Sequence, residues 1–278
     1  MNKTFTGADI RPFLKGGAAD LRFDIRQVVT STNTLLKEEA RAGEPGGKVM
    51  LALEQTAGKG RLGRSFHSPK SSGLYLSMLL RPDLPPEQAT RLTTVAAVAV
   101  AQAMEEITGT GVDIKWVNDV YRDGRKLCGI LTEAGIKGDG TLDFAVVGIG
   151  VNLTEPEGGF PENISHIAGA LYPDEATCPE NLYERLAAAI LNHFMEYYGQ
   201  LPSTNYLEEY RKRSYLLGQD IYVIEALTSE GLPVSEPRLA HAEAIDDELR
   251  LVVSYPDGTR QALSTGEVSV RAVSNYNL

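Results

Sequence analysis

The sequence has only two cysteines, Cys128 and Cys178, among its 278 residues. Two cysteines supply neither a disulfide framework nor the spacing of a metal site, so a reducing compartment is expected. The start of the chain, MNKTFTGADIRPFLKGG, lacks the apolar core of a signal peptide. The longest apolar stretch, TTVAAVAVAQAM, is too short and too rich in alanine to span a membrane. These absences predict a cytoplasmic protein without a membrane partner.

Acidic residues are missing from one long segment. The chain carries a net charge of −10, yet Gln55 to Pro82 contains no Asp or Glu. The same segment contains several cations, which are Lys59, Arg61, Arg64, Lys70 and Arg81. A protein that binds a nucleic-acid backbone usually carries a net positive charge, so we expect no DNA partner. The segment is either a solvated basic hairpin or a local anion-binding site.

The length allows one large domain and a small one. From about Ser214 the pattern changes to short strands joined by Gly, Asp and Pro turns, including a PDG hairpin signal. We therefore expect a domain boundary near this point, with a larger domain over residues 1–213 and a small β-barrel over residues 214–278.

The larger domain mixes strand and helix signals. Ser31-Thr32-Asn33 reads as the N-cap of a helix that ends near Gly43. Strands are expected at KVMLALEQ, GLYLSMLL and LDFAVVGIGVNL, and a hairpin that turns at Asp123-Gly124. Helices are expected over residues 86–108 and 180–212. We also expect an exposed strand near Ala145 to Gly148 that could pair with another chain.

The segment GKGRLGR, residues 58–64, matches G-x-G-x-x-G but fails the context of each familiar loop. A dinucleotide fingerprint needs a helix next, and RSFHSPKSSG does not open one. The kinase partner motifs are absent, and GEPGGKV is too short for a Walker loop. Glycines still allow backbone N–H groups to converge on an anion, and interleaved cations strengthen the grip. We expect this loop to bind a concentrated anion and to be mobile when empty.

Several motifs together resemble the biotin–protein ligases. They are TSTN, GKGRLGRSFHSPKSSGLYLSMLLRP, KWVNDV, RKLCGILTE, VGIGVNL and TGEVSVR, in the family's order. Three residues depart from the family pattern: Lys59 replaces an Arg, Phe66 a Trp and Val117 a Pro. About 25 residues precede the first motif, so the resemblance is to the ligase-only class without a DNA-binding domain.

The resemblance implies an α+β fold: a mixed β-sheet catalytic domain with packed helices, like class II synthetases, then an SH3-like β-barrel. It implies that biotin attacks the α-phosphorus of ATP, giving biotinyl-AMP. A lysine of a biotin carboxyl carrier domain, such as that of acetyl-CoA carboxylase, would then take the biotin. Mg²⁺ would be held mainly by the phosphates, with no metal site built by the protein.

The resemblance also assigns site residues. The catalytic residues would be Lys126, Arg61 and Asp119, with Asp119 positioning either the metal or the acceptor lysine. Biotin would contact Ser31, Thr32, Asn33, Gln55, Lys59, Gly60, Arg61 and Lys126. ATP would contact Gly58, Arg61, Arg64, Lys115, Asn118, Lys126 and Asn152. Simpler interpretations remain open, because Ser31-Thr32-Asn33 could be only a helix cap and Asn152 only a turn residue.

Two other functions compete. A lipoate or octanoyl ligase of the same superfamily would bind an apolar chain, and the polar Ser31, Thr32 and Gln55 favour biotin instead. A nucleic-acid-binding regulator would use the basic segment, but the net charge argues against it. We expect a monomer or a weak homodimer.

Overall fold

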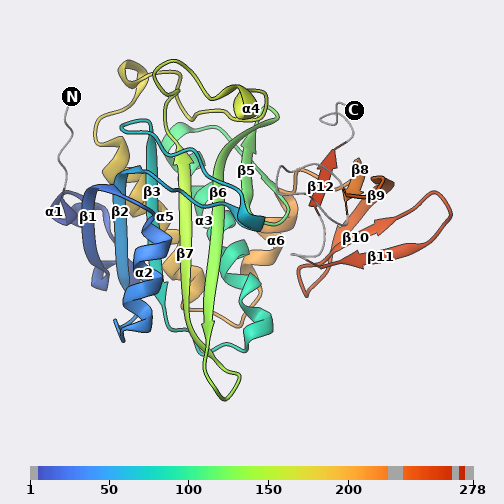
Figure 1. Ribbon diagram of the computed structural model, residues 1–278, viewed down its shortest axis with the longest axis horizontal. Coiled ribbons are helices and arrows are strands. Elements are labelled where there is room, and N and C mark those ends of the chain that lie inside the picture. The colour runs from blue at the N-terminus through green and yellow to red at the C-terminus, as the bar shows by residue number, and fades with distance from the viewer. Residues whose placement is uncertain (1–5, 225–233, 265–268, 273–278) are drawn as a thin grey trace.

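A mixed seven-stranded sheet forms the body of the computed structural model, which describes residues 6–224, 234–264 and 269–272 (Figure 1). Its strand order is β1-β2-β3-β7-β6-β5-β4, and a second, five-stranded sheet has the order β11-β10-β9-β8-β12. The described helices are α1 (Gly7–Ile10), α2 (Thr32–Arg41), α3 (Thr90–Thr108), α4 (Glu162–Ser165), α5 (Leu182–Tyr198) and α6 (Asn205–Lys212). Short 3₁₀ turns lie at Arg11–Phe13, Gly16–Asp20, Arg61–Gly63, Pro86–Gln88 and Glu175–Thr177.

The large sheet consists of β1 (Arg22–Val29), β2 (Lys48–Gln55), β3 (Gly73–Leu80), β4 (Asp113–Lys115), β5 (Asp119–Arg122), β6 (Arg125–Ile136) and β7 (Leu142–Asn152). Strand β1 runs parallel to β2, and the other neighbours are antiparallel. The predicted mixed sheet with packed helices is confirmed.

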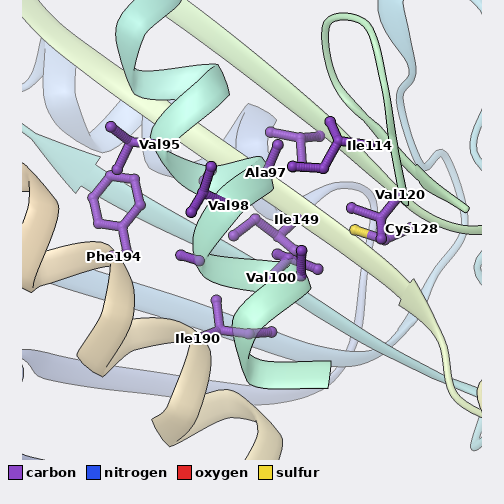
Figure 2. Packing of buried hydrophobic residues seen from close by; sticks show 14 of the residues in the cluster. Val95, Ala97, Val98, Val100, Ile114, Val120, Cys128, Ile149, Ile190 and Phe194 are labelled. Carbon is purple, nitrogen blue, oxygen red and sulfur yellow. The ribbon is translucent and has the colours of Figure 1, made fainter. Parts of the chain in front are cut away.

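The two faces of this sheet are covered differently because successive side chains of a strand point to opposite sides. On one face, Val147, Ile149 and Val151 of β7 join the main core with α3 and α5. Figure 2 shows Val95 and Val98 of α3 facing Phe194 and Ile190 of α5. On the other face, Phe144 and Val146 of β7 pack with Leu36 and Ala40 of α2. Helix α2 covers only part of its face, and the rest stays open for a site.

Helix α3 confirms the helix expected over this region, with a 3₁₀ turn at Pro86–Gln88 before it. It ends at Gly109, whose φ of 68° lies in the left-handed region that glycine adopts without strain. Most of its length is buried, since its alanines let α5 and the sheet approach closely. The helical stretch expected over 180–212 is divided into α5 and α6, and Gly199 and Pro202 lie between the two helices.

The expectation of an exposed strand at Ala145 to Gly148 is wrong. These residues pair with β3 on one side and β6 on the other. The edges of the large sheet are instead β1 and β4. A continuous apolar run is typical of a central strand buried on both faces, which explains the error.

The second sheet contains β8 (Asp220–Ile224), β9 (Arg238–Ile245), β10 (Leu251–Ser254), β11 (Arg260–Leu263) and β12 (Ser269–Ala272). It agrees with the small β domain expected after the helices, and the boundary expected near Ser214 falls between α6 and β8. Residues 265–268 of the TGEVSVR motif lie outside the described residues.

The two sheets are joined through the segment that follows β4. The buried indole of Trp116 donates from Nε1 to the carbonyl oxygen of Leu249 at 2.9 Å. Helix α6 lies between them: its Tyr210 hydroxyl donates to the Val117 carbonyl at 3.1 Å, and Arg211 Nε donates to the Ile245 carbonyl at 2.8 Å. The segment that carries the KWVNDV motif is therefore held from the side of the second sheet.

Within the described ranges, we find no helix that combines the length and the apolar character required to cross a bilayer.

We predict that Trp116→Phe lowers the free energy of unfolding by about 1–3 kcal/mol, because the buried carbonyl of Leu249 loses its donor. Trp116 is the only tryptophan of the chain, so urea unfolding should be followed by far-ultraviolet circular dichroism. The control is Arg260→Gln, which removes an exposed ion pair with Glu243 on the same sheet and should change stability by less than about 0.5 kcal/mol. Equal effects of the two substitutions would contradict the role of the indole.

Candidate functional site

Three glycines clear the open part of the sheet face beside α2. Gly148 and Gly150 alternate with core residues on β7, and Gly129 pairs with Gly150 from β6. A Cβ on Gly150 would lie 2.6 Å from Cε1 of Phe66, and one on Gly148 would lie 2.1 Å from Oδ1 of Asn33. Glycine inside a strand often marks a close approach of another group. Here two side chains occupy the space that a Cβ would need.

A cavity lies over this glycine floor. Its lining combines residues of α2, β2, the glycine loop, β6 and β7. The predicted site residues on it are Ser31, Thr32, Asn33, Gln55, Lys59, Gly60, Arg61, Asn118 and Lys126. Residues that the sequence did not single out complete it: Phe66, Leu76, Gly129, Ile130, Leu131, Gly148, Ile149 and Gly150. Glycines inside otherwise apolar strands were the signal that could have identified part of this second group.

One end of the cavity is polar and uncharged. Ser31 is the N-cap of α2, and its Oγ accepts from the Thr34 backbone at 3.5 Å. The Gln55 side-chain oxygen accepts from the Thr32 backbone at 2.9 Å and from the Thr32 hydroxyl at 3.1 Å. The Ser-Thr-Asn run therefore both caps the helix and lines the cavity, and its contact with biotin stays a prediction.

Glu133 fixes this polar end from behind. Its carboxylate accepts from Asn33 Nδ2 at 3.2 Å and pairs with the ammonium of Lys37. Burial alone would raise the pKa of Glu133, but hydrogen bonds from Lys37 and Asn33 outweigh it and hold the pKa below the ordinary value of 4.5. Asn33 is thus oriented by a charged partner on β6.

The other end of the cavity is cationic. Arg61 donates from Nη1 to Asn118 Oδ1 at 2.9 Å, and Lys126 Nζ lies 2.7 Å from Asp119 Oδ1. Asn118 Nδ2 also donates to that Asp119 oxygen at 2.9 Å. Burial lowers the pKa of Arg61 and Asp119 opposes this, and a guanidinium stays protonated in proteins. The Asp119 carboxylate thus pairs directly with Lys126 and is linked to Arg61 through the Asn118 amide.

The glycine loop is folded over this cationic end. Phe66 donates its backbone N–H to the Gly58 carbonyl at 2.9 Å, and Gly60 donates to the Arg64 carbonyl at 2.7 Å. At the tip, Leu62 has a φ of 56°, a left-handed conformation that is costly for a side-chain-bearing residue, and its side chain is exposed. The loop reaches the cavity through Arg61 while its tip stays in solvent.

The main chain of Lys126 is held on both sides by the segment after α4. Its N–H donates to the Ile167 carbonyl at 2.7 Å, and its carbonyl accepts from Gly169 N–H at 2.9 Å. The neighbouring Arg125 donates to the carbonyls of Ser165 and Ala168 at 2.9 and 3.1 Å. Lys126 therefore projects from a fixed backbone, and the Arg125 guanidinium is bound to the segment after α4.

Five predicted residues do not line the cavity: Gly58, Arg64, Lys115, Asp119 and Asn152. Asp119 still reaches it through Lys126. A Cβ on Gly58 would lie 2.4 Å from the Phe66 carbonyl oxygen, so this glycine permits the closed loop. Lys115 Nζ lies 5.3 Å from the ring centre of Tyr121. The buried Asn152 amide donates to the Gly169 carbonyl at 2.9 Å, which ties the same segment to β7.

A second hollow adjoins the first and shares Arg61 and Leu131 with it. Its other lining residues come from the loop tip, α3, the segment after β4 and the far half of β6: Leu62, Ala89, Thr90, Thr93, Val117, Thr132 and Ala134. The far half of β6 has no pairing with β5, because β5 pairs with β6 over Arg125 to Gly129 alone. This hollow opens a second approach to Arg61.

Metal binding by the protein alone has no support in the geometry. Among the residues for which the structure gives positions, no group of three or more His, Cys, Asp or Glu side chains could hold a metal ion. Buried Cys128 lies on the core side of β6, where burial raises the pKa of its thiol, so it is not poised as a nucleophile. The cavity is suited to a molecule with a neutral hydrogen-bonding end and an anionic end.

Comparisons with known proteins agree with this geometry. A model of the biotin/lipoate A/B protein ligase family matches residues 25–152. The biotin–[acetyl-CoA-carboxylase] ligase of Mycobacterium tuberculosis is 30% identical over 259 residues, which cover 91% of this chain and 90% of that protein. The bifunctional ligase/repressor BirA of Bacillus subtilis is 38% identical over 164 residues, covering 59% of this chain and 50% of that protein. The chain thus spans about half the length of that relative.

A solved structure is also similar. The biotin protein ligase from Aquifex aeolicus, in complex with biotin and ATP, superposes with a TM-score of 0.74 at 25% sequence identity. The match covers 90% of this chain and 99% of that one. Both sheets of the described fold fall within a match of this extent.

We predict that Glu133→Gln destabilises the protein by about 1 kcal/mol at pH 7 and by progressively less as the pH falls below the ordinary value of 4.5. The native pKa of Glu133 is depressed, so its ionised form contributes stability above the ordinary value of 4.5. That contribution is lost as the pH falls through the native pKa. Urea unfolding across this range measures the difference, with the exposed Glu157→Gln as control. A difference from wild type that does not change with pH would refute the assignment.

Proposed function

The chain belongs to the biotin/lipoate A/B protein ligase family, and on this basis we propose that it is an ATP-dependent biotin ligase. It would activate biotin as biotinyl-5′-AMP and transfer it to a lysine of a biotin carboxyl carrier domain, as the name of the Mycobacterium relative suggests. One observation supports this most strongly: a single cavity joins a neutral polar end at Thr32 and Gln55 to a cationic end at Arg61 and Lys126. Biotin has the same two ends, a ureido ring and a carboxylate.

The first step brings the biotin carboxylate to the α-phosphorus of ATP. A carboxylate oxygen forms the new P–O bond, and the bond to pyrophosphate breaks. Two unit charges 4 Å apart repel by about 4 kcal/mol at an effective dielectric constant near 20. Arg61 and Lys126 would offset this repulsion and the charge that develops in the transition state. Arg61 suits the bridging role because its planar fork can bind a carboxylate and a phosphate together.

Asp119 would hold these cations before the anions arrive. It pairs with Lys126 at 2.7 Å, so that its negative charge compensates the positive charge of the ammonium beside Arg61. When a carboxylate and a phosphate enter, Lys126 gains new partners, and the Asp119 oxygen can turn to the acceptor lysine or to a metal. The roles assigned to Lys126, Arg61 and Asp119 would then be linked, because Lys126 exchanges Asp119 for the anions of the substrates.

The nucleotide would lie beside Lys126, next to the segment with the KWVNDV motif. Asn118 lines the cavity, and Gly58, Arg64, Lys115 and Asn152 are assigned to ATP by the resemblance alone. Mg²⁺ would neutralise the triphosphate. It would be held mainly by phosphate oxygens, because the described residues contain no group of three or more His, Cys, Asp or Glu side chains that could hold a metal ion.

The second step transfers biotin to the carrier. The lysine nitrogen attacks the carbonyl carbon of the anhydride, a C–N bond forms, the C–O bond to AMP breaks, and the amine loses a proton. We propose that the lysine enters through the second hollow, which meets the first at Arg61 and Leu131. A cytoplasmic location and a monomer or weak homodimer remain predictions.

A lipoate or octanoyl ligase is the alternative within the same family. Those chains present no hydrogen-bonding head to the oxygens of Thr32, Asn33 and Gln55, which would then be buried without new partners. The polar end of the cavity therefore favours biotin.

The decisive measurement is the exchange of labelled pyrophosphate into ATP, measured separately with each candidate carboxylic acid. We expect exchange with biotin and at least about 10²-fold less with lipoate or octanoate, since an unmatched polar pocket rejects apolar analogues strongly. Transfer of labelled biotin to a carrier domain tests the second step. Preferential exchange with lipoate would instead establish the alternative.

We predict that Lys126→Ala lowers the exchange rate about 10²–10³-fold, since the ammonium is fixed in place before the anions meet. Arg125→Ala should cost less, because that guanidinium binds the carbonyls of Ser165 and Ala168 rather than the cavity. Lys126→Arg should rescue only partly, because a planar fork does not replace a compact ammonium. Circular dichroism verifies folding; near wild-type exchange by a folded Lys126→Ala protein would overturn the assignment.

A further inference from the structure

Lys126 lies near the start of β6, before the pairing of β6 with β7 begins. The first pair joins Cys128 to Val151, and β7 ends at Asn152. Residues 165–171, here called the strap, run from the end of α4 and take the place beside Lys126 that β7 leaves open. The position of Lys126 therefore depends on a segment from outside the large sheet.

The strap and Lys126 form a parallel bridge. Lys126 donates its N–H to the Ile167 carbonyl at 2.7 Å, and its own carbonyl accepts from the Gly169 N–H at 2.9 Å. These two bonds fix the backbone of Lys126 and with it the direction in which the side chain leaves the strand. A shift of the strap would therefore move the Lys126 ammonium relative to Asp119 and to the cavity.

Three side chains hold the carbonyl oxygens of the strap, and they come from the ends of β5, β6 and β7. The bonds are Arg125 to Ser165 and Ala168 at 2.9 and 3.1 Å, Asn152 to Gly169 at 2.9 Å, and Arg122 to Ala170 and Leu171 at 3.4 and 2.7 Å. The two acceptors of Arg125 lie on either side of Ile167, which is the acceptor of the Lys126 N–H. Arg125 therefore fixes the part of the strap that Lys126 contacts.

The strap also approaches the side chain of Arg125 closely. A Cβ on Gly169 would lie 2.7 Å from Cβ of Arg125 and 3.4 Å from Cδ2 of Leu127. Glycine at this position leaves the room in which the strap can bond to both Arg125 and Lys126. The contact thus requires a guanidinium on β6 and the absence of a side chain on the strap.

We propose that Arg125 is a positioning residue for the first step of the reaction: it holds the strap against β6, and the strap holds Lys126. This inference rests on the proposed ligase function and adds to it a residue that contacts no substrate. Lys126 lines the cavity and Arg125 does not, as expected for neighbours on a strand. A guanidinium outside the cavity thus determines where the ammonium inside it lies before the anions meet.

Two other roles of Arg125 predict different results. A merely structural residue would affect stability and leave pyrophosphate exchange by the folded protein unchanged. A distant positive charge would attract the anions, and its loss would slow pyrophosphate exchange whether or not Lys126 is present. A positioning residue acts only through Lys126.

The experiment measures biotin-dependent exchange of labelled pyrophosphate into ATP by wild type and Arg125→Ala. We expect kcat to fall roughly tenfold, since a misplacement of about 1 Å can cost about 10²-fold and the backbone bonds of Lys126 remain in this variant. The KM for biotin should change less than about threefold, because the neutral end of the cavity is untouched. A wild-type kcat in a folded Arg125→Ala protein would overturn the proposal.

A Lys126→Ala background separates position from charge. In this background, Arg125→Ala should lower the remaining exchange less than about twofold, because the ammonium that it positions is gone. A further loss as large as in the wild-type background would show that Arg125 acts by its charge, and the proposal would fail.

Gly169→Ala tests the strap without removing a charge. Its Cβ would force the strap away from Arg125, so kcat should fall by a factor similar to that of Arg125→Ala. The matched control is Arg81→Ala, which removes a guanidinium bound to the carbonyls of Ala40 and Glu44 near the end of α2. It should leave kcat within about twofold of wild type. A wild-type kcat in Gly169→Ala would contradict the role of the strap.

Amide hydrogen exchange of peptides that contain Lys126 gives a readout that does not depend on catalysis. The Lys126 N–H should lose protection in Arg125→Ala, and unchanged protection would count against the proposal. If wild type incorporates no labelled pyrophosphate with biotin, the proposed function itself fails. If wild type incorporates label normally and Arg125→Ala does so equally well, only this inference fails.

Discussion

The charge balance around Asp119 is the constraint on which this site depends. Arg61 and Lys126 both line the cavity, and like charges that share a cavity repel one another. Asp119 lies 2.7 Å from Lys126, and Asn118 links it to Arg61 through hydrogen bonds at both ends of its amide. One carboxylate and one amide therefore keep the cations assembled. The glycine loop can fold over the site because Arg61 has a partner there.

The residues around Asp119 are not all held equally firmly by the surrounding structure. Lys126 projects from a strand whose backbone is bonded to the segment after α4 on both sides, and Asn152 ties the same segment to β7. The segment that carries Asn118 is held through Trp116 by the second sheet and through Val117 by α6. Arg61 instead comes from a loop whose tip is exposed and left-handed at Leu62. The groups on the strands are therefore fixed, whereas Arg61 is carried by a loop with an exposed tip.

Much of this could be predicted from the sequence, where local signals determine local structure. The Ser31 cap, the β2 strand, the turn at Asp123-Gly124 and the glycine loop each depend on neighbours in the chain. The motifs then predicted the family and most of the residues that line the cavity. The exposed strand expected at Ala145 failed because an apolar run does not reveal which strands pair with it.

The remaining features depend on register and on contacts between distant segments. Ser77 meets Asn33 across 44 positions, and Glu133 meets Asn33 across 100. Such contacts require that β3, β6 and β7 be aligned residue by residue, which no local pattern specifies. Asn152 makes another contact between separate segments, since its amide donates to the Gly169 carbonyl, and its predicted contact with a nucleotide stays a prediction.

The glycine floor has a consequence for how this site can change over generations. At Gly148 and Gly150 even the smallest side chain would collide with Asn33 or Phe66, so a substitution at either position requires one of these side chains to move. Sequence change is restricted at the glycines of the floor. It is less restricted on the walls of the cavity, where α2 and the glycine loop contribute side chains that can differ in size. Substitutions that reshape the cavity are therefore expected on those two elements, above an unaltered pair of glycines.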